Sequence, residues 1–342
     1  MKQILNRCKA CGAITSYDIA GSAVGCPFCH TAEPLNLDRG FPKKNEYSNN
    51  SNFLPFKELL QIYKCTNCGC VYESKDERSN NCPSCGSGNF LITSTLNSVP
   101  DAILPFLLSK SVASKHFKKW TRRKWFAPHD LKKVASLDSA EPIYYPLFVL
   151  DAENRFDYSG VGIINRTDSK GNSTTKRCPF SDSLNTSIRS MLVPATDKIS
   201  AGAINSLAPF KLSCTTKFDK RYLYGFSACP TTISANDCYQ KAKEQIQRQN
   251  IAEATSNKRL VYDNILNLTG TTTLSSPAFA LCYAPLWKAS YTYKQKKYNC
   301  YINGTTGKTA GVAPLSKLKV GLFTLGLVAL IAGIVLLITH FS

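Results

Sequence analysis

Eight of the fifteen cysteines in this 342-residue chain stand in four pairs, each with two residues between its members. The pairs form two doublets, with 14 residues between the pairs of the first and 13 between those of the second. Zinc takes four thiolates in a tetrahedron, and a two-residue spacing lets both sulfurs of a pair reach one ion. The spacing therefore predicts two zinc ribbons with two structural Zn²⁺ ions. The expected ligands are Cys8, Cys11, Cys26 and Cys29 in one site and Cys65, Cys68, Cys82 and Cys85 in the other.

The residues beside the pairs suit tight metal-binding turns. Gly12, Gly69 and Gly86 each follow the second cysteine of a pair, where a left-handed turn is easiest for glycine. His30 takes that place in the second pair and is an alternative ligand, although four thiolates already fill a tetrahedron. Such closed sites leave no open position for a catalytic water, so we expect the zinc to stabilise two small modules.

Disulfides and redox pairs are alternative interpretations of these cysteines. Disulfides need an oxidising compartment, and we expect no secretory signal, because Met1, Lys2 and Gln3 lead directly to the first pair. A thioredoxin-like motif would use one pair and not two matched doublets. We expect Cys70 to be a bystander and the other six cysteines to be buried thiols in a reducing cytosol. Those six are Cys178, Cys214, Cys229, Cys238, Cys282 and Cys300.

A run of 19 uncharged residues, Val320–Ile338, has the length and composition of a membrane span. As a helix it would be about 28 Å long, close to the roughly 30 Å of a hydrocarbon core. Lys317 and Lys319 precede the run and no Lys or Arg follows it. By the positive-inside rule we predict a single-pass protein of the plasma (cell) membrane with its N-terminus in the cytoplasm.

The composition is strongly basic. Lys and Arg number 42 against 23 Asp and Glu, a net charge of +19, and the mean hydropathy of -0.17 excludes a multi-pass membrane protein. The charge is most concentrated in 96–136, where nine basic and two acidic residues give +7. Residues 111–124 can form an amphipathic helix with Ala113, Phe117 and Trp120 on one face.

Three interpretations of this basic segment stay open. It is a solvated helix face, a contact for anionic inner-leaflet lipid, or a site for nucleic-acid phosphate. The candidate contact residues are Lys115, Lys118, Lys119, Arg122, Arg123 and Lys124.

The remaining chain predicts an α+β fold on an antiparallel sheet, lying between the two ribbons and the transmembrane anchor. Strand-like runs are 143–150, 155–164, 260–268, 278–286, 290–293 and 298–302. We expect a helix over 235–254, with Asn236 or Asp237 as its N-cap, and another over 198–207. The expected domains are zinc ribbon 1 (1–38), a linker (39–56), zinc ribbon 2 (57–95), a basic aromatic helical segment (96–136), an α+β domain (137–316) and the anchor (317–342).

No catalytic signature is evident in the sequence. Residues 304–309 resemble the end of a phosphate-binding loop, but Ile302 stands where the motif needs glycine, so we expect a hairpin turn. The histidines form no metal-binding or nucleophile pattern. We therefore expect neither an enzyme nor a small-molecule substrate.

An ordered set of stretches resembles a bacterial family of tandem zinc-ribbon membrane proteins, labelled TFIIB-type zinc ribbon-containing, and especially its YdjG-like members. Phe148 departs from the pattern, where the family usually has Trp. The resemblance implies a non-catalytic membrane adaptor that recruits SPFH (flotillin-like) or phage-shock-protein-A-like partners in envelope maintenance or stress. The matching stretches are 8–13, 82–87, 99–106, 117–133, 143–153, 284–311 and the closing span.

Two functional expectations follow. The first is an adaptor at the cytoplasmic face of the membrane that binds protein partners. The alternative is a nucleic-acid-binding protein tethered to the membrane, suggested by the net charge and the basic aromatic segment.

Overall fold

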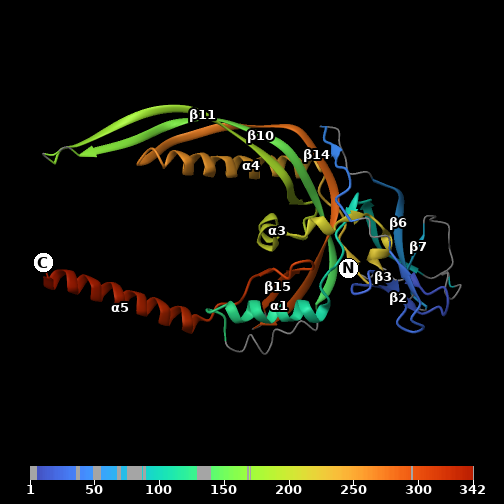
Figure 1. The fold of residues 1–342 in the computed structure, drawn as a ribbon. Coiled ribbons are helices and arrows are strands. Elements are labelled where there is room, and N and C mark those ends of the chain that lie inside the picture. The colour runs from blue at the N-terminus through green and yellow to red at the C-terminus, as the bar shows by residue number, and fades with distance from the viewer. Residues whose placement is uncertain are drawn as a thin grey trace.

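The computed structural model has a mixed α+β fold, as predicted (Figure 1). It describes residues 6–35, 39–48, 55–67, 71–74, 87, 90–128, 140–167, 169, 171–293 and 296–341. A nine-stranded sheet forms the body, and two smaller sheets precede it along the chain. All positions and contacts below refer to these described residues.

The main path of the body sheet runs β11-β10-β14-β15-β16, and each neighbouring pair on it is antiparallel. These strands are β10 (Glu141–Thr167), β11 (Ser173–Pro194), β14 (Asn264–Tyr293), β15 (Lys296–Asn303) and β16 (Thr309–Gly311). Four two-residue strands complete the sheet: β5 (Asn45–Glu46), β9 (Ala102–Ile103), β12 (Thr216–Lys217) and β13 (Ser227–Ala228).

The first half of β10 is covered on both faces. Tyr145 and its odd-numbered neighbours pack with α3 (Ala201–Leu207). Tyr144 packs with α1 (Lys110–Arg123), and Phe148 packs with α4 (Ala235–Lys258). Two covered faces explain why this stretch is a nearly continuous hydrophobic run in the sequence.

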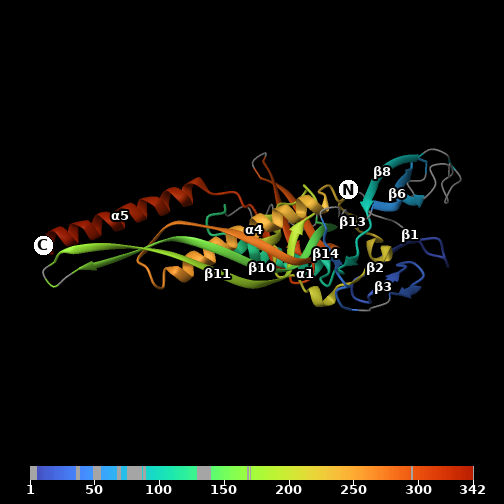
Figure 2. The same cartoon turned by 90° about the horizontal axis from the view of Figure 1, so that it is seen from above.

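Beyond this region β10, β11 and β14 continue as a long arm (Figures 1 and 2). Along β10 buried and exposed residues alternate, with Asn154 and Phe156 buried and Glu153, Arg155 and Asp157 exposed. The buried face lies against α4, whose Asn250 exchanges hydrogen bonds with Asn154 at 2.9 and 3.1 Å. One covered face suffices for a two-layer arm, which is why the period-two pattern appears here.

Several predicted elements are present with shifted bounds. The helix expected over 235–254 extends to Lys258, and its N-cap is Ser234, which accepts from the Asp237 backbone N–H at 3.1 Å. The helix expected over 198–207 begins at Ala201, and the strand expected from 260 begins at Asn264. The prediction did not include β11, because much of this edge strand is polar and exposed.

The helix α1 buries the predicted face, with Ala113, Phe117 and Trp120 in the core. Residues 102–103 within the segment predicted as 96–136 belong to the body sheet as β9. Residues 39–48 lie within the predicted linker, yet β5 pairs with β14 there. Lys44 pairs with Asp151 at 2.6 Å, so ion pairing and backbone bonds hold a segment whose polar composition suggested a linker.

The two N-terminal sheets have the orders β1-β2-β3-β4 and β7-β6-β8. Their strands are β1 (Asn6–Arg7), β2 (Ile14–Asp18), β3 (Ala23–Gly25), β4 (Ala32–Pro34), β6 (Pro55–Cys65), β7 (Val71–Ser74) and β8 (Phe90–Ser98). The 3-10 helices η1 (Leu212–Cys214) and η2 (Lys220–Leu223) lie in the body.

The first of these sheets, residues 6–35, is called the cysteine module here, and it is docked on the body. Its Tyr17 is buried, donates its backbone N–H to Tyr224 O at 2.9 Å and packs edge-on to Tyr222 at 5.0 Å. Arg221 pairs with Glu33 of the module at 2.8 Å. The module and the body therefore share one hydrophobic core.

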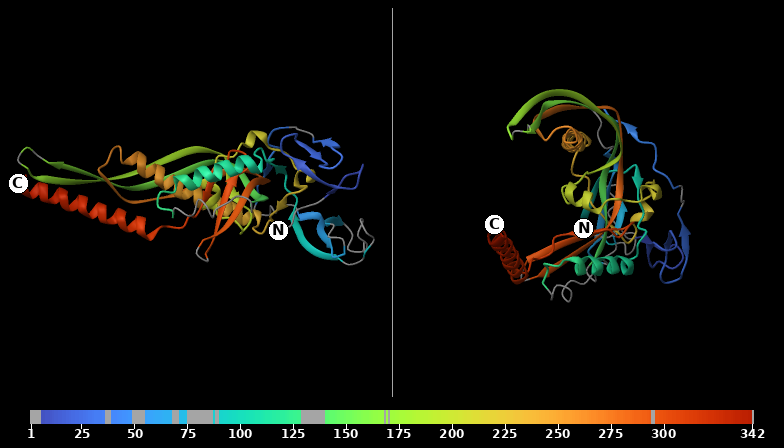
Figure 3. Two further views of the ribbon diagram at one scale, coloured as in Figure 1. Left: turned by 90° about the horizontal axis from the view of Figure 1, so that it is seen from below. Right: turned by 60° about the vertical axis from the view of Figure 1, so that its left-hand side comes forward.

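The last helix, α5 (Lys317–Phe341), includes 22 residues, Lys317–Ile338, that are long and apolar enough to cross a membrane. Their mean hydropathy is 2.7, and none of that stretch is buried against the rest of the chain. The arm tip and the end of α5 lie at one end of the molecule, and the cysteine module lies at the other (Figure 3).

The docking contact predicts a selective effect of one added methyl group. Gly225 has φ +81°, and a Cβ there would lie 2.8 Å from Ser16 Cβ of the module. Gly171 has φ +83° with nothing within 4 Å, so Gly171→Ala carries the backbone strain without the clash. We expect Gly225→Ala to lower the hydrogen-exchange protection factor of the Tyr17 amide at least about tenfold, and Gly171→Ala to leave it unchanged. Equal protection in both variants would contradict the docking.

Candidate metal centre

Four cysteine sulfurs meet in the cysteine module. The Sγ atoms of Cys8 and Cys29 are 3.5 Å apart, as are those of Cys11 and Cys26, and all four lie within 4.8 Å of one another. Thiolates at about 2.3 Å from a central ion would be about 3.8 Å apart in a tetrahedron. The four sulfurs therefore lie close to the corners of a tetrathiolate site, and the group could hold a metal ion.

Two turns of the same design present these sulfurs. In the first, Cys8 N–H donates to Ala13 O at 2.7 Å and Gly12 N–H donates to Cys8 O at 2.9 Å. In the second, Cys26 N–H donates to Thr31 O at 2.9 Å and His30 N–H donates to Cys26 O at 3.0 Å. Each turn follows a strand that is antiparallel to β2, so the two cysteine pairs lie at the same end of the small sheet.

The residue after each pair has the left-handed backbone that the sequence predicted. Gly12 has φ +74° and His30 has φ +59°. Among the described residues the ligand group consists of the four cysteines, and His30 is exposed outside it. His30 therefore takes the backbone role of the glycine and not that of a ligand.

The thiols of Cys11 and Cys29 differ in pKa. Hydrogen bonding from Thr31, whose Oγ1 lies 3.1 Å from Cys29 Sγ, lowers the pKa of Cys29 to about 6. At Cys11 the backbone of Ala13 lowers the pKa, but the neighbouring sulfurs and burial outweigh it and raise the value to about 12. The Cys29 thiolate forms readily while Cys11 keeps its proton, so metal binding must release a proton from Cys11 and weaken as the pH falls.

The second cysteine set lies mostly outside the described residues. Cys65 is buried at the end of β6, while Cys68, Cys82 and Cys85 are not described, and neither are Gly69, Gly86 and Cys70. The second metal site stays a prediction.

The other six cysteines divide into two groups. Cys229, Cys238, Cys282 and Cys300 are buried as predicted, whereas Cys178 and Cys214 are half-buried. Burial raises the pKa of Cys229, Cys238 and Cys300 to about 12. Such thiols are protonated at neutral pH, which makes them unreactive core residues.

The turn at 304–309 joins β15 to β16, as the sequence predicted. Asn303 Oδ1 accepts from the backbone N–H and the hydroxyl of Thr305 at 2.8 and 2.7 Å, while its Nδ2 donates to Leu207 O at 3.0 Å. Asn303 is fully buried and holds the turn together from inside. Sequence reasoning did not identify this role, which depends on a contact 96 residues away.

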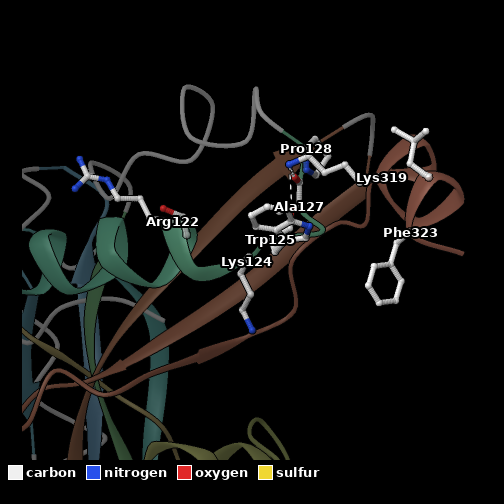
Figure 4. A pocket seen from close by; sticks show the side chains of 9 residues that line it. Arg122, Lys124, Trp125, Ala127, Pro128, Lys319 and Phe323 are labelled. Atoms are coloured by element: carbon white, nitrogen blue, oxygen red, sulfur yellow. Dashed lines mark hydrogen bonds between the residues drawn. The ribbon is translucent and has the colours of Figure 1, made fainter. Parts of the chain in front are cut away.

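The predicted basic contact residues lie along α1 and at its C-terminal end. Lys115, Lys118, Lys119, Arg122, Arg123 and Lys124 are all exposed, opposite the buried face of the helix. Lys124 Nζ lies 5.0 Å from the Trp120 ring centroid. Arg122 and Lys124 line one pocket with Lys319 of α5, and Arg122 lies on the side of Trp125 away from α5 (Figure 4).

Comparison with known proteins gives one informative likeness. The chain is 24% identical over 240 residues to a Bacillus subtilis (strain 168) protein named "Uncharacterized protein YdjG", covering 67% of each chain. No family model matches the chain, and no solved structure matches it. The printed name states no activity, so the likeness assigns none.

The sulfur geometry predicts which cysteines hold metal. Replacing Cys26 with Ser removes one of four ligands and leaves three facing sulfurs, so we expect bound metal per chain to fall by about one equivalent. Cys178→Ser is the matched control, because Cys178 is a half-buried thiol on β11 outside the cluster. Metal content is measured by elemental mass spectrometry at equal protein concentration. The same content in both variants would rule out a metal site at the cluster.

Proposed function

We propose that this protein is a non-catalytic adaptor, held by α5 at the cytoplasmic face of the plasma membrane, that recruits protein partners. The observation that carries the proposal is the exposure of α5. A helix with mean hydropathy 2.7 and no cover from the described chain requires apolar surroundings elsewhere. A bilayer supplies them, since its core is about as thick as this helix is long. Lys317 and Lys319 before the apolar stretch favour a cytoplasmic N-terminus.

The metal in the cysteine cluster is proposed to be zinc. Four thiolates with no additional ligand suit Zn²⁺ in a structural role, and a reduced cytoplasm keeps the thiols available. The matching spacing of the second doublet supports a second zinc site of the same kind. On this proposal residues 1–38 and 57–95 are zinc ribbons, and the chain is a member of the YdjG-like tandem zinc-ribbon proteins.

The arm limits how α5 can enter a bilayer. The arm and α5 extend toward the same end of the molecule (Figures 1 and 3). Arg166, Lys176 and Arg177 are exposed near the arm tip, and hydrocarbon does not accept such side chains. Membrane insertion therefore requires α5 to bend away from the arm beyond Phe323, while its first turns keep their contacts with residues 125–127.

Proteins are the favoured partners of the adaptor. The family resemblance points to SPFH or phage-shock-protein-A-like partners. The nucleic-acid alternative rests on the basic face of α1. That face ends beside the first turn of α5, where a membrane-bound helix would bring it to lipid.

Phe28 provides a probe of partner binding. It lies between two metal-binding cysteines with 83% of its surface exposed, while Leu260 at the far end of α4 is 86% exposed. We expect a photo-crosslinking side chain at Phe28 to capture an SPFH or phage-shock-protein-A-like protein in living cells, because the metal holds this turn in place. The same probe at Leu260 is the matched control.

Two further results decide the interpretation. Adding Cys26→Ser to the Phe28 probe should reduce capture at least about fivefold, as the turn loses its metal. Identical capture from both positions, or capture that Cys26→Ser leaves unchanged, would contradict partner binding at the cysteine module. Crosslinks from Arg122 to nucleic acid in the same cells would support the alternative.

A further inference from the structure

The end of α1 is tied to the beginning of α5. Ser316 N–H donates to Phe126 O at 2.7 Å. Lys319 Nζ donates to the carbonyl oxygens of Trp125 and Ala127 at 3.0 and 2.8 Å. The rings of Phe126 and Phe323 meet edge to face with centroids 5.3 Å apart. The turn after α1 is thus fixed to the place where α5 changes from charged to apolar.

A pocket of about 520 Å³ lies at this junction, here called the junction pocket (Figure 4). One part of its lining is basic and comes from Arg122, Lys124 and Lys319. Another part is apolar and comes from Trp125, Leu322 and Phe323. In Figure 4 the Arg122 and Lys124 side chains leave the end of α1 in different directions, and the Trp125 ring lies between Arg122 and Lys319. The three basic side chains are called the basic rim here.

The charge around the junction pocket is of one sign. Residues 110–128 contain seven Lys and Arg and no Asp or Glu. Within the described parts of the chain, Arg122, Arg123 and Lys118 form no ion pair. An arriving anion would therefore meet no competing carboxylate on this segment. Attraction of this kind strengthens the binding of basic segments to an anionic membrane surface.

The exposure of Trp125 also indicates a membrane surface at the junction pocket. It is 77% exposed, which is unusual for so large a ring in water, while tryptophan is enriched where a membrane meets water. Leu322 and Phe323 lie within the apolar part of α5, and Lys319 lies just before it. Any bilayer that surrounds α5 would bring lipid headgroups to the level of the basic rim.

We propose that the junction pocket binds an anionic glycerophospholipid, with its phosphate at the basic rim and the start of its acyl chains against Leu322 and Phe323. A nucleic acid offers the same phosphate chemistry, but the pocket adjoins the apolar part of α5, which a bilayer would surround, so a lipid is the favoured source of the phosphate. The inference rests on the proposed membrane anchor and adds a specific lipid class to it.

The test uses the full chain purified in detergent and mixed with equal amounts of phosphatidylglycerol and phosphatidylcholine. Native mass spectrometry measures the ratio of the two lipids retained by the protein. We expect wild-type protein to favour phosphatidylglycerol, and Arg122→Gln with Lys124→Gln to reduce that ratio at least about fivefold. Lys115→Gln with Lys118→Gln is the matched control, because it removes the same charge from α1 away from the junction pocket.

Each outcome decides between the explanations. Loss of the phosphatidylglycerol preference in the Arg122 and Lys124 variant alone supports lipid binding at the junction pocket. Equal loss in both variants would show attraction to the whole basic helix, and no preference in wild-type protein would show no lipid site, so either result overturns the inference. Salt-sensitive binding of an oligonucleotide that the Arg122 and Lys124 variant alone loses, with lipid retention unchanged, would assign the pocket to nucleic acid.

Failure of the inference is distinguishable from failure of the anchor. A full chain that dissolves without detergent and retains no lipid would contradict the anchor itself. A chain that needs detergent yet shows no preference for phosphatidylglycerol would contradict the junction pocket alone. Thermal unfolding of both double variants checks that they keep the wild-type fold.

Discussion

Burial of Phe106 among other aromatic rings holds the described molecule together. Its ring meets Tyr144, Phe226 and Trp287 with centroids 5.0–5.3 Å apart. Phe226 also contacts Tyr17 of the cysteine module, and Trp287 donates to Leu108 O at 3.0 Å just before α1 begins. Edge-on and tilted contacts of this kind add specificity to the burial of apolar surface. The cysteine module, the body sheet and the support of α5 therefore depend on one core.

This shared core connects the cysteine module to the first turn of α5. The two cysteine turns follow strands that pair with β2, which carries Tyr17. The helix α1 packs in the same core and leads to the turn that binds Lys319 of α5. A structural metal in the cysteine module would thus stabilise a surface that belongs to the whole body. The arm extends from the other part of the sheet and is held by α4.

Local patterns in the sequence identified some features, and distant contacts decided others. The spacing of Cys8 and Cys11 and the uncharged run of α5 are local, and the structure bears out a possible metal group and an apolar helix. Much of β11 is polar, so no local pattern predicted a strand there, and its pairing with β10 decides its structure. The docking of Tyr17 on η2 and the buried role of Asn303 likewise depend on residues far along the chain.

Alkaline extraction of cell membranes tests whether α5 anchors the chain, since it releases peripheral proteins and keeps those that cross the bilayer. We compare the full chain with a chain that ends at Ser316, just before α5. We expect the full chain to stay with the membranes and the shorter chain to be soluble and still carry the metal of the cysteine cluster. Release of the full chain into the soluble fraction would show that α5 does not cross the bilayer.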